Sequence, residues 1–150
     1  MQEIKKVLYE KCVGYADERI SSIENALQAS HEASVNDTKS SAGDKYETTR
    51  EMMQQEISRN AQQLMEAKKM RMALDKFSPD TASDVVKQGS FVITSEGDFY
   101  ISISAGQLTA DGRPVYSVSA HSPIGRLMLG CKAGDSIEMN KRVFNILKVC

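Results

Sequence analysis

Two carboxylates three residues apart are the chemical feature of the sequence that best suits a functional site. Asp44 and Glu47 follow Gly43, and if a helix begins here, both side chains lie on the same side of its first turn. Two exposed carboxylates can hold a hard divalent cation such as magnesium and leave positions for water and phosphate. A cation held in this way can activate water or complete a two-metal site.

The same spacing also fits a purely structural role. Asp-x-x-Glu at the start of a helix is a capping pattern, in which both side chains bind free backbone N–H groups. Taken alone, Asp44 and Glu47 favour capping, because capping is common. The long helical stalk predicted around them favours ligand binding, since a cap needs no stalk. Both interpretations stay open at this point.

Two long helices are predicted to present the acidic pair. The first has apolar residues at alternating spacings of three and four, at Val13, Ala16, Ile20, Ile23 and Leu27. The second shows the same spacing at Arg50, Met53, Ile57, Asn60, Leu64, Ala67, Arg71 and Leu74. Residues 34–43 are rich in turn formers. We therefore expect an antiparallel coiled-coil hairpin over residues 1–78, with helices about 45 Å long and an acidic tip at about residues 35–47.

The second half of the chain changes to β-type alternation after a linker at residues 79–87. Asn140-Lys141 and Glu96-Gly97 are expected in hairpin turns, and Ser122 and Pro123 are expected to cap a short helix that extends through Leu129 and can end at Gly130. The predicted strands are 90–94, 98–103, 115–119, 136–139 and 143–149. The fold class is therefore α+β, with a small β-rich domain at residues 88–150.

Composition restricts the classes of partner. The chain has 20 acidic and 19 basic residues, a net charge of -1, so nucleic acid is expected to be reached through a protein partner. Its three cysteines form no zinc or disulfide pattern. No signal peptide or membrane span is apparent, and we expect a cytoplasmic protein without a membrane partner. Lys5, Lys6 and Lys11 are interpreted as part of a solvated charged helix face.

Residues 122–135 carry a resemblance to a known family. Ser-Pro-Ile-Gly-Arg-Leu-Met-Leu-Gly-Cys-Lys-Ala-Gly-Asp, followed by a terminal hairpin, resembles the C-terminal domain of GreA and GreB, the bacterial transcript-cleavage factors. Gly43-Asp44 with Glu47 is similar to the Gly-Asp-x-x-Glu tip of that family. The order of the parts agrees over nearly the whole chain. The resemblance implies that the β-rich domain is FKBP-like.

The resemblance also implies a function. Gre factors dock on the rim of the secondary channel of RNA polymerase, and their tip acids help to hold the second catalytic Mg²⁺. The polymerase then hydrolyses the backtracked 3′ end of the nascent RNA. Asp44 and Glu47 are accordingly the expected catalytic and metal-binding pair, and His121, Ser122 and Pro123 the expected docking element. The protein is expected to be a monomer, not itself an enzyme, with Mg²⁺ shared with the polymerase and no tightly bound cofactor.

The tip departs from the family pattern after the glutamate. Family tips often continue Asn-Ala-acid-Tyr, whereas this chain continues with residues 48–51, Thr-Thr-Arg-Glu, and has its aromatic residue at Tyr46. Arg50 thus favours an alternative, a Gre-like secondary-channel regulator that modulates or inhibits the polymerase without cleavage. An unrelated coiled-coil adaptor remains a third hypothesis. A prolyl isomerase is disfavoured, because the chain has no tryptophan and only four phenylalanines to line an aromatic pocket.

Overall fold

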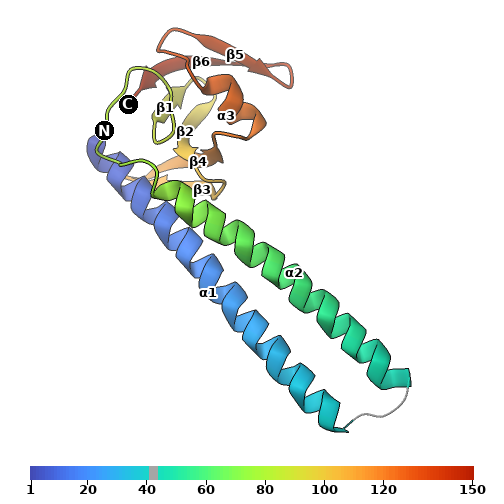
Figure 1. Cartoon of the computed structure of the whole chain (residues 1–150). Coiled ribbons are helices and arrows are strands. Elements are labelled where there is room, and N and C mark those ends of the chain that lie inside the picture. Colours follow the sequence, from blue (N-terminus) through green and yellow to red (C-terminus); the bar gives the residue numbers. More distant parts are fainter. Residues whose placement is uncertain (41–43) are drawn as a thin grey trace. The chain divides into compact units, whose positions relative to one another are not determined.

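The computed structural model describes the backbone of residues 1–40 and 44–150, and the side chains of residues 1–33 and 47–150. Helices α1 (Gln2–Ser40) and α2 (Asp44–Leu74) come first, and a six-stranded sheet with the short helix α3 (Pro123–Met128) follows (Figure 1). The predicted α+β class is confirmed. The chain divides into two compact units, Ala16–Arg71 and Met1–Tyr15 with Met72–Cys150. No helix among the described residues is long and apolar enough to span a membrane.

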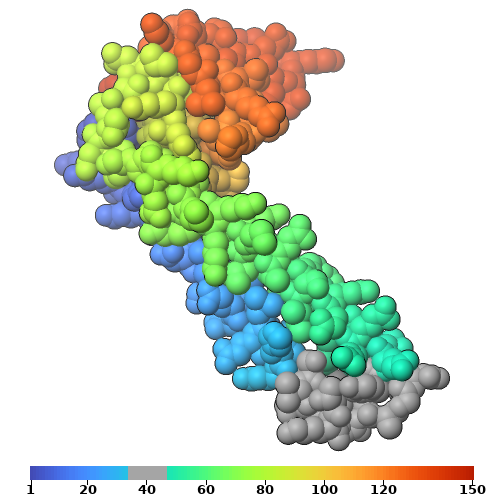
Figure 2. Space-filling view, viewed as in Figure 1, coloured from blue at the N-terminus to red at the C-terminus, as the bar shows by residue number. Residues whose placement is uncertain are grey.

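Burial along the two helices follows spacings of three and four residues. Within the unit Ala16–Arg71, one stripe on each helix is buried or half-buried, and the residues between its members are exposed. The helices run side by side in opposite directions (Figure 1, Figure 2). Asp17 and Arg71 add an ion pair between them, with Nε 3.1 Å from Oδ1. The stripes comprise Ala16, Ile20, Ile23, Leu27, Met53, Ile57, Asn60, Leu64 and Ala67.

Two expectations for this part of the chain were wrong. Arg50 is exposed, and the neighbouring Thr49 is the half-buried residue. Arg50 lies three residues before Met53 and Thr49 lies four before it. Both spacings fit a helical stripe, so the sequence could not show which of the two residues is buried. The turn expected at 34–43 is wrong for residues 34–40, because α1 continues to Ser40. Serine, asparagine and aspartate each cost a helix only about 0.5 kcal/mol relative to alanine, so they do not have to end it.

The six strands form one sheet in the order β3-β4-β2-β1-β6-β5. Neighbouring strands are antiparallel except β2 and β4, which run parallel. The five predicted strands are present, whereas β3 was missed because Leu108 is its one large apolar residue. The bounds are β1 (Phe91–Thr94), β2 (Gly97–Ser102), β3 (Gly106–Ala110), β4 (Arg113–Ser119), β5 (Ser136–Met139) and β6 (Arg142–Val149).

Two of the hairpins turn through pairs of residues with positive φ. Asp111 (φ 53°) and Gly112 (φ 74°) connect β3 to β4, and Asn140 (φ 53°) and Lys141 (φ 65°) connect β5 to β6. Two successive left-handed residues are typical of a type I′ turn, whose twist matches that of the flanking strands. The predicted closing hairpin across Asn140-Lys141 is confirmed.

The main core lies on the face of the sheet that α3 covers. Phe99 and Phe144 pack edge to face, with ring centroids 6.1 Å apart. Met128 of α3 is fully buried in the same cluster. The other buried members are Val86, Val92, Ile101, Ile124, Ile137 and Ile146.

The opposite face of the sheet holds the first turns of α1. Cys12 is buried, with its Sγ 3.4 Å from Ser117 Oγ of β4. Tyr9 donates a hydrogen bond to Leu74 O at 2.8 Å. Lys5, interpreted from the sequence as solvated, is buried instead, and its Nζ donates to a backbone carbonyl. Helical position alone could not predict this burial, because the covering residues lie far along the chain.

The segment 79–87 packs on this unit as well. Val86 is buried, and its N–H donates to Cys131 O at 2.9 Å. Gly130 N donates in turn to Val86 O at 2.9 Å. The segment is therefore joined by backbone hydrogen bonds to the residues that follow α3.

Tyr100 is expected to destabilise the protein through its hydroxyl. The residue is fully buried, and its hydroxyl has no hydrogen-bond partner among the described residues. Replacing a buried, unpaired polar group by an apolar one removes a desolvation cost. We expect Tyr100→Phe to raise the free energy of unfolding by about 1 kcal/mol, measured by urea denaturation. The exposed Tyr116 provides the control, since Tyr116→Phe should leave stability unchanged.

The same substitution should change stability at alkaline pH. Burial, with the nearby Cys12 and Tyr9, raises the pKa of Tyr100 far above its usual range. The unfolded chain ionises this phenol near pH 10, whereas the folded protein keeps it neutral. Below about pH 10 the phenol is neutral in both states and its ionisation does not affect the free energy of unfolding. Above that pH, ionisation favours the unfolded chain, so the free energy of unfolding of the wild type falls as the pH rises. Tyr100→Phe should lose less stability above pH 10 than the wild type. An equal loss in both proteins would contradict this account.

Candidate functional site

The first turn of α2 carries the predicted acidic pair. α2 begins at Asp44, whose side chain lies outside the described residues. Glu47 lies in the same turn and its side chain is exposed. No ion pair between described residues involves Glu47. Its carboxylate is therefore not held in an ion pair with another described residue.

The described side chains contain no complete metal site. No group of three or more His, Cys, Asp or Glu residues among them lies close enough together to hold a metal ion. Asp44 lies outside that set, so the magnesium role of Asp44 and Glu47 stays a prediction. An exposed carboxylate is an oxygen donor of the kind that magnesium takes.

The residues after Glu47 change the charge of this turn. Arg50 and Glu51 are exposed and lie three and four residues after Glu47, which makes both its neighbours on the helix surface. Thr49 is half-buried instead. A guanidinium beside Glu47 weakens the attraction of the turn for a cation, and Glu51 strengthens it. Arg50 and Glu51 therefore have opposite effects on the binding of a cation near Glu47.

The expected docking residues lie together at the start of α3. Ser122 caps the helix as predicted: its hydroxyl accepts a hydrogen bond from Gly125 N (3.1 Å) and donates one to Ser119 O (2.6 Å). His121 and Pro123 are exposed on either side of it. Ser122 is thus occupied in holding the turn, while His121 and Pro123 face solvent.

Gly125 in α3 approaches the end of β4 very closely. A Cβ at this position would lie 2.1 Å from Ser119 O and 3.0 Å from Ser122 Oγ. No other amino acid fits without moving backbone atoms. The Ser-Pro-Ile-Gly sequence therefore determines how α3 packs on the sheet.

The remaining part of the 122–135 motif forms tight turns. Gly130 follows the helix with φ 84°, as expected for a residue that ends a helix. Asp135 Oδ2 accepts a hydrogen bond from Lys132 N at 2.8 Å. Gly134, with φ 97°, donates to Ile146 O at 2.8 Å. These residues hold the path of the backbone between α3 and β5.

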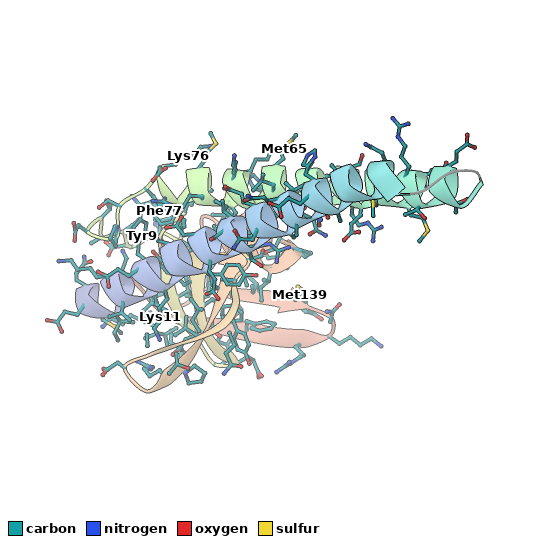
Figure 3. All side chains as sticks on the ribbon, turned by 90° about the horizontal axis from the view of Figure 1, so that it is seen from below. Tyr9, Lys11, Met65, Lys76, Phe77 and Met139 are labelled. Atoms are coloured by element: carbon teal, nitrogen blue, oxygen red, sulfur yellow. The ribbon has the colours of Figure 1, made fainter. Side chains whose placement is uncertain are left out.

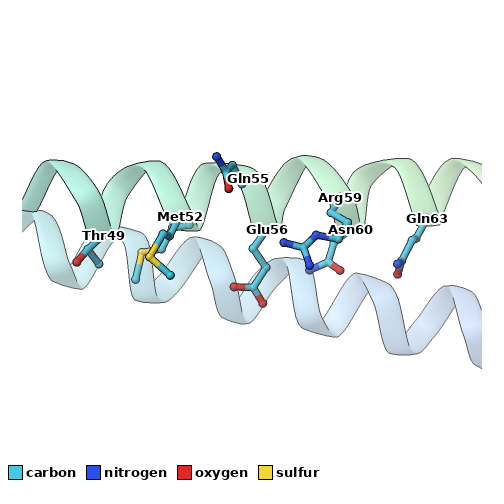
Figure 4. A pocket seen from close by; sticks show the side chains of 8 residues that line it. Thr49, Met52, Gln55, Glu56, Arg59, Asn60 and Gln63 are labelled. Atoms are coloured by element: carbon cyan, nitrogen blue, oxygen red, sulfur yellow. The ribbon is translucent and has the colours of Figure 1, made fainter.

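A groove of about 620 Å³ lies along α2 and was not predicted, and its lining includes both exposed and half-buried residues of the helix. Met52, with 66% of its surface exposed, gives it an apolar side chain. Glu56 points toward the neighbouring helix, whereas Gln55 points away from it (Figure 4). The pair Met52-Met53 was the available signal in the sequence. The groove is lined by Thr49, Met52, Met53, Gln55, Glu56, Arg59, Asn60 and Gln63.

Comparisons with known proteins give only weak structural likeness. No protein-family model and no curated protein matches the chain. A solved structure of the transcription factor Gfh1 has 19% sequence identity to this chain and a TM-score of 0.37. The alignment covers 94% of this chain and 92% of the Gfh1 chain. A likeness at this score does not bear on the function of the chain.

Proposed function

We propose that the protein is a transcription elongation factor that enters the secondary channel of RNA polymerase and stimulates cleavage of backtracked RNA. The observation that carries the proposal is the first turn of α2, where Asp44 begins the helix and Glu47 follows with an exposed side chain. The resemblance of this turn and of residues 122–135 to Gre factors supports the proposal.

The paired helices provide the reach that this function needs. α2 has 31 residues, which corresponds to a length of about 46 Å. Its first turn is thus separated from Leu74, at its other end, by the full length of the helix. A narrow helical stalk can carry two carboxylates into a channel that would exclude a globular domain.

Asp44 and Glu47 act in this proposal as additional oxygen ligands at the polymerase active site. Magnesium supplies there the Lewis acidity and the activated water that phosphodiester hydrolysis requires. The two carboxylates orient the reacting groups, and the polymerase performs the hydrolysis, so the factor is not itself an enzyme. Exposed carboxylates alone bind magnesium weakly, which makes a metal shared with the polymerase the natural arrangement.

The start of α3 is proposed as the docking element on the channel rim. His121 and Pro123 are exposed, and Ser122 holds them in place through its two hydrogen bonds. A contact surface on a short, capped helix is already ordered before binding, which lowers the entropy cost of association. His121 and Pro123 are the side chains available for direct contact.

One observation favours the alternative, a channel regulator without cleavage activity. Arg50 is exposed and lies one helical turn from Glu47. Its positive charge disfavours a second cation near the acidic pair. In this alternative the helical tip occupies the channel and modulates or inhibits the polymerase.

RNA shortening in a halted, backtracked elongation complex tests the proposal. We expect added protein to shorten the nascent RNA from its 3′ end much faster than the complex alone, and to be retained by core polymerase in a pull-down. Binding without shortening would replace the proposal by the non-cleaving regulator. Failure to bind polymerase would contradict both hypotheses and leave the unrelated adaptor.

A further inference from the structure

A second hollow lies in the sheet-containing unit, where the chain leaves α2. Lys76 and Lys87 are exposed at its rim, whereas Phe77 and Gln88 are half-buried. Charged groups thus surround an aromatic and amide floor. The hollow has a volume of about 280 Å³ and is lined by Lys76, Phe77, Ser78, Thr81, Lys87 and Gln88.

The floor of the hollow is held by aromatic packing. The Phe77 ring lies edge to face with Tyr9 at 5.7 Å and with Tyr100 at 6.5 Å between centroids. Gly89 leaves room for the ring, since a Cβ there would lie 2.8 Å from Phe77 Cδ2. Figure 3 shows Lys76 and Phe77 at the end of α2, near Tyr9 of α1. These contacts hold the Phe77 ring in place, so the hollow exists before any ligand binds.

The polar groups around the hollow are available to a ligand. The ammonium groups of Lys76 and Lys87 form no ion pair or hydrogen bond with the described residues. Ser78 Oγ accepts a hydrogen bond from Asp80 N at 3.2 Å, which leaves its O–H free to donate. Two ammonium groups and a hydroxyl thus offer donors, and ammonium groups bind anionic oxygen most strongly.

A buried lysine adds positive charge beneath the rim. Lys5 is 1% exposed, and its Nζ donates a hydrogen bond to Thr81 O at 2.5 Å. Asp80 is close to this group, but its carboxylate is 3.5 Å from the ammonium of Lys6. The residues that line the hollow include Lys76 and Lys87 and no acidic residue, so the lining itself is positively charged and attracts anions.

We propose that this hollow binds a phosphate-bearing small molecule through a phosphate or diphosphate group held by Lys76 and Lys87. Its volume is close to the lower end of the range for small-molecule sites, about 300 Å³, which suits a diphosphate better than a whole nucleotide. A nucleoside could extend from the open side, over the exposed part of Phe77. The proposal does not depend on the proposed role in transcription.

Titration of the isolated protein with inorganic phosphate, pyrophosphate and ADP, followed by amide NMR, tests the proposal. We expect saturable shifts at Ser78, Thr81 and Gln88. Lys76→Gln and Lys87→Gln should each weaken diphosphate binding by about tenfold. The exposed Lys141 on the β5–β6 turn gives the matched control, because Lys141→Gln removes the same charge elsewhere.

The three ligands distinguish the source of the group. Equal binding of pyrophosphate and ADP supports a site for the diphosphate alone. Tighter binding of ADP, still weakened in Lys76→Gln and Lys87→Gln, supports a nucleotide-borne diphosphate. Shifts that do not saturate, or that persist unchanged in both variants while their spectra show an intact fold, would overturn the proposal.

Discussion

Replacing Asp44 by asparagine is expected to reduce RNA shortening in a backtracked complex by about a hundredfold or more. Loss of an outer-shell partner of a metal site typically costs up to about a hundredfold, and Asp44 is proposed as a direct ligand. Asparagine removes the charge but remains a good N-cap residue. The helix start should therefore persist, and binding to the polymerase should change little.

Glu51 provides the matched control for this prediction. It is exposed and lies one turn after Glu47 on α2. Glu47→Gln should reduce shortening as strongly as Asp44→Asn does, whereas Glu51→Gln removes the same charge and should retain most of the activity. Undiminished shortening by Asp44→Asn would show that the proposed metal role of Asp44 is wrong.

Replacing Gly125 by alanine is expected to destabilise the sheet-containing unit by about 3 kcal/mol, the upper end of the usual range for overpacking. The new Cβ would lie 2.1 Å from Ser119 O, a backbone atom that cannot rotate away. α3 would have to move, which breaks the 3.1 Å hydrogen bond from Gly125 N to Ser122 Oγ. The buried Met128 would lose its packing on the sheet.

Gly14 gives the opposite expectation for the same chemical change. It lies inside α1, and a Cβ there would meet no atom within 4 Å. Gly14→Ala should raise the free energy of unfolding by about 0.5–1 kcal/mol, because alanine loses less backbone entropy in a helix. Urea denaturation of both variants measures the two effects. Equal stability of Gly125→Ala and the wild type would show that α3 does not pack as described.

The acidic turn and the docking element were predicted from residues close together in the chain. Asp44 and Glu47 share one helical turn, and Ser122 caps a helix that begins at the next residue. Such features depend on local hydrogen bonds and spacing. The exposure of Arg50 could not be predicted, because spacings of three and four are equally compatible with a helical stripe.

The diphosphate site was beyond prediction for a different reason. Lys5 and Lys87 are far apart in sequence, and only the folded chain brings both close to Thr81, which lines the hollow and accepts a hydrogen bond from Lys5. From the sequence, Lys5 belonged to a charged helix face. Whether a lysine is solvated or buried depends on what covers it, and Lys5 is buried with its Nζ bonded to Thr81 O, from a distant part of the chain.

The sequence by itself determined the α+β class, the helical stripes, the turn at Asn140-Lys141 and the cap at Ser122. Each follows from periodicity or from backbone preferences within a few residues. Only the tertiary structure decided that Cys12 lies against Ser117, that Gly125 touches Ser119 O and that Lys5 is buried. Packing and desolvation depend on atoms from distant parts of the chain, and local patterns do not contain that information.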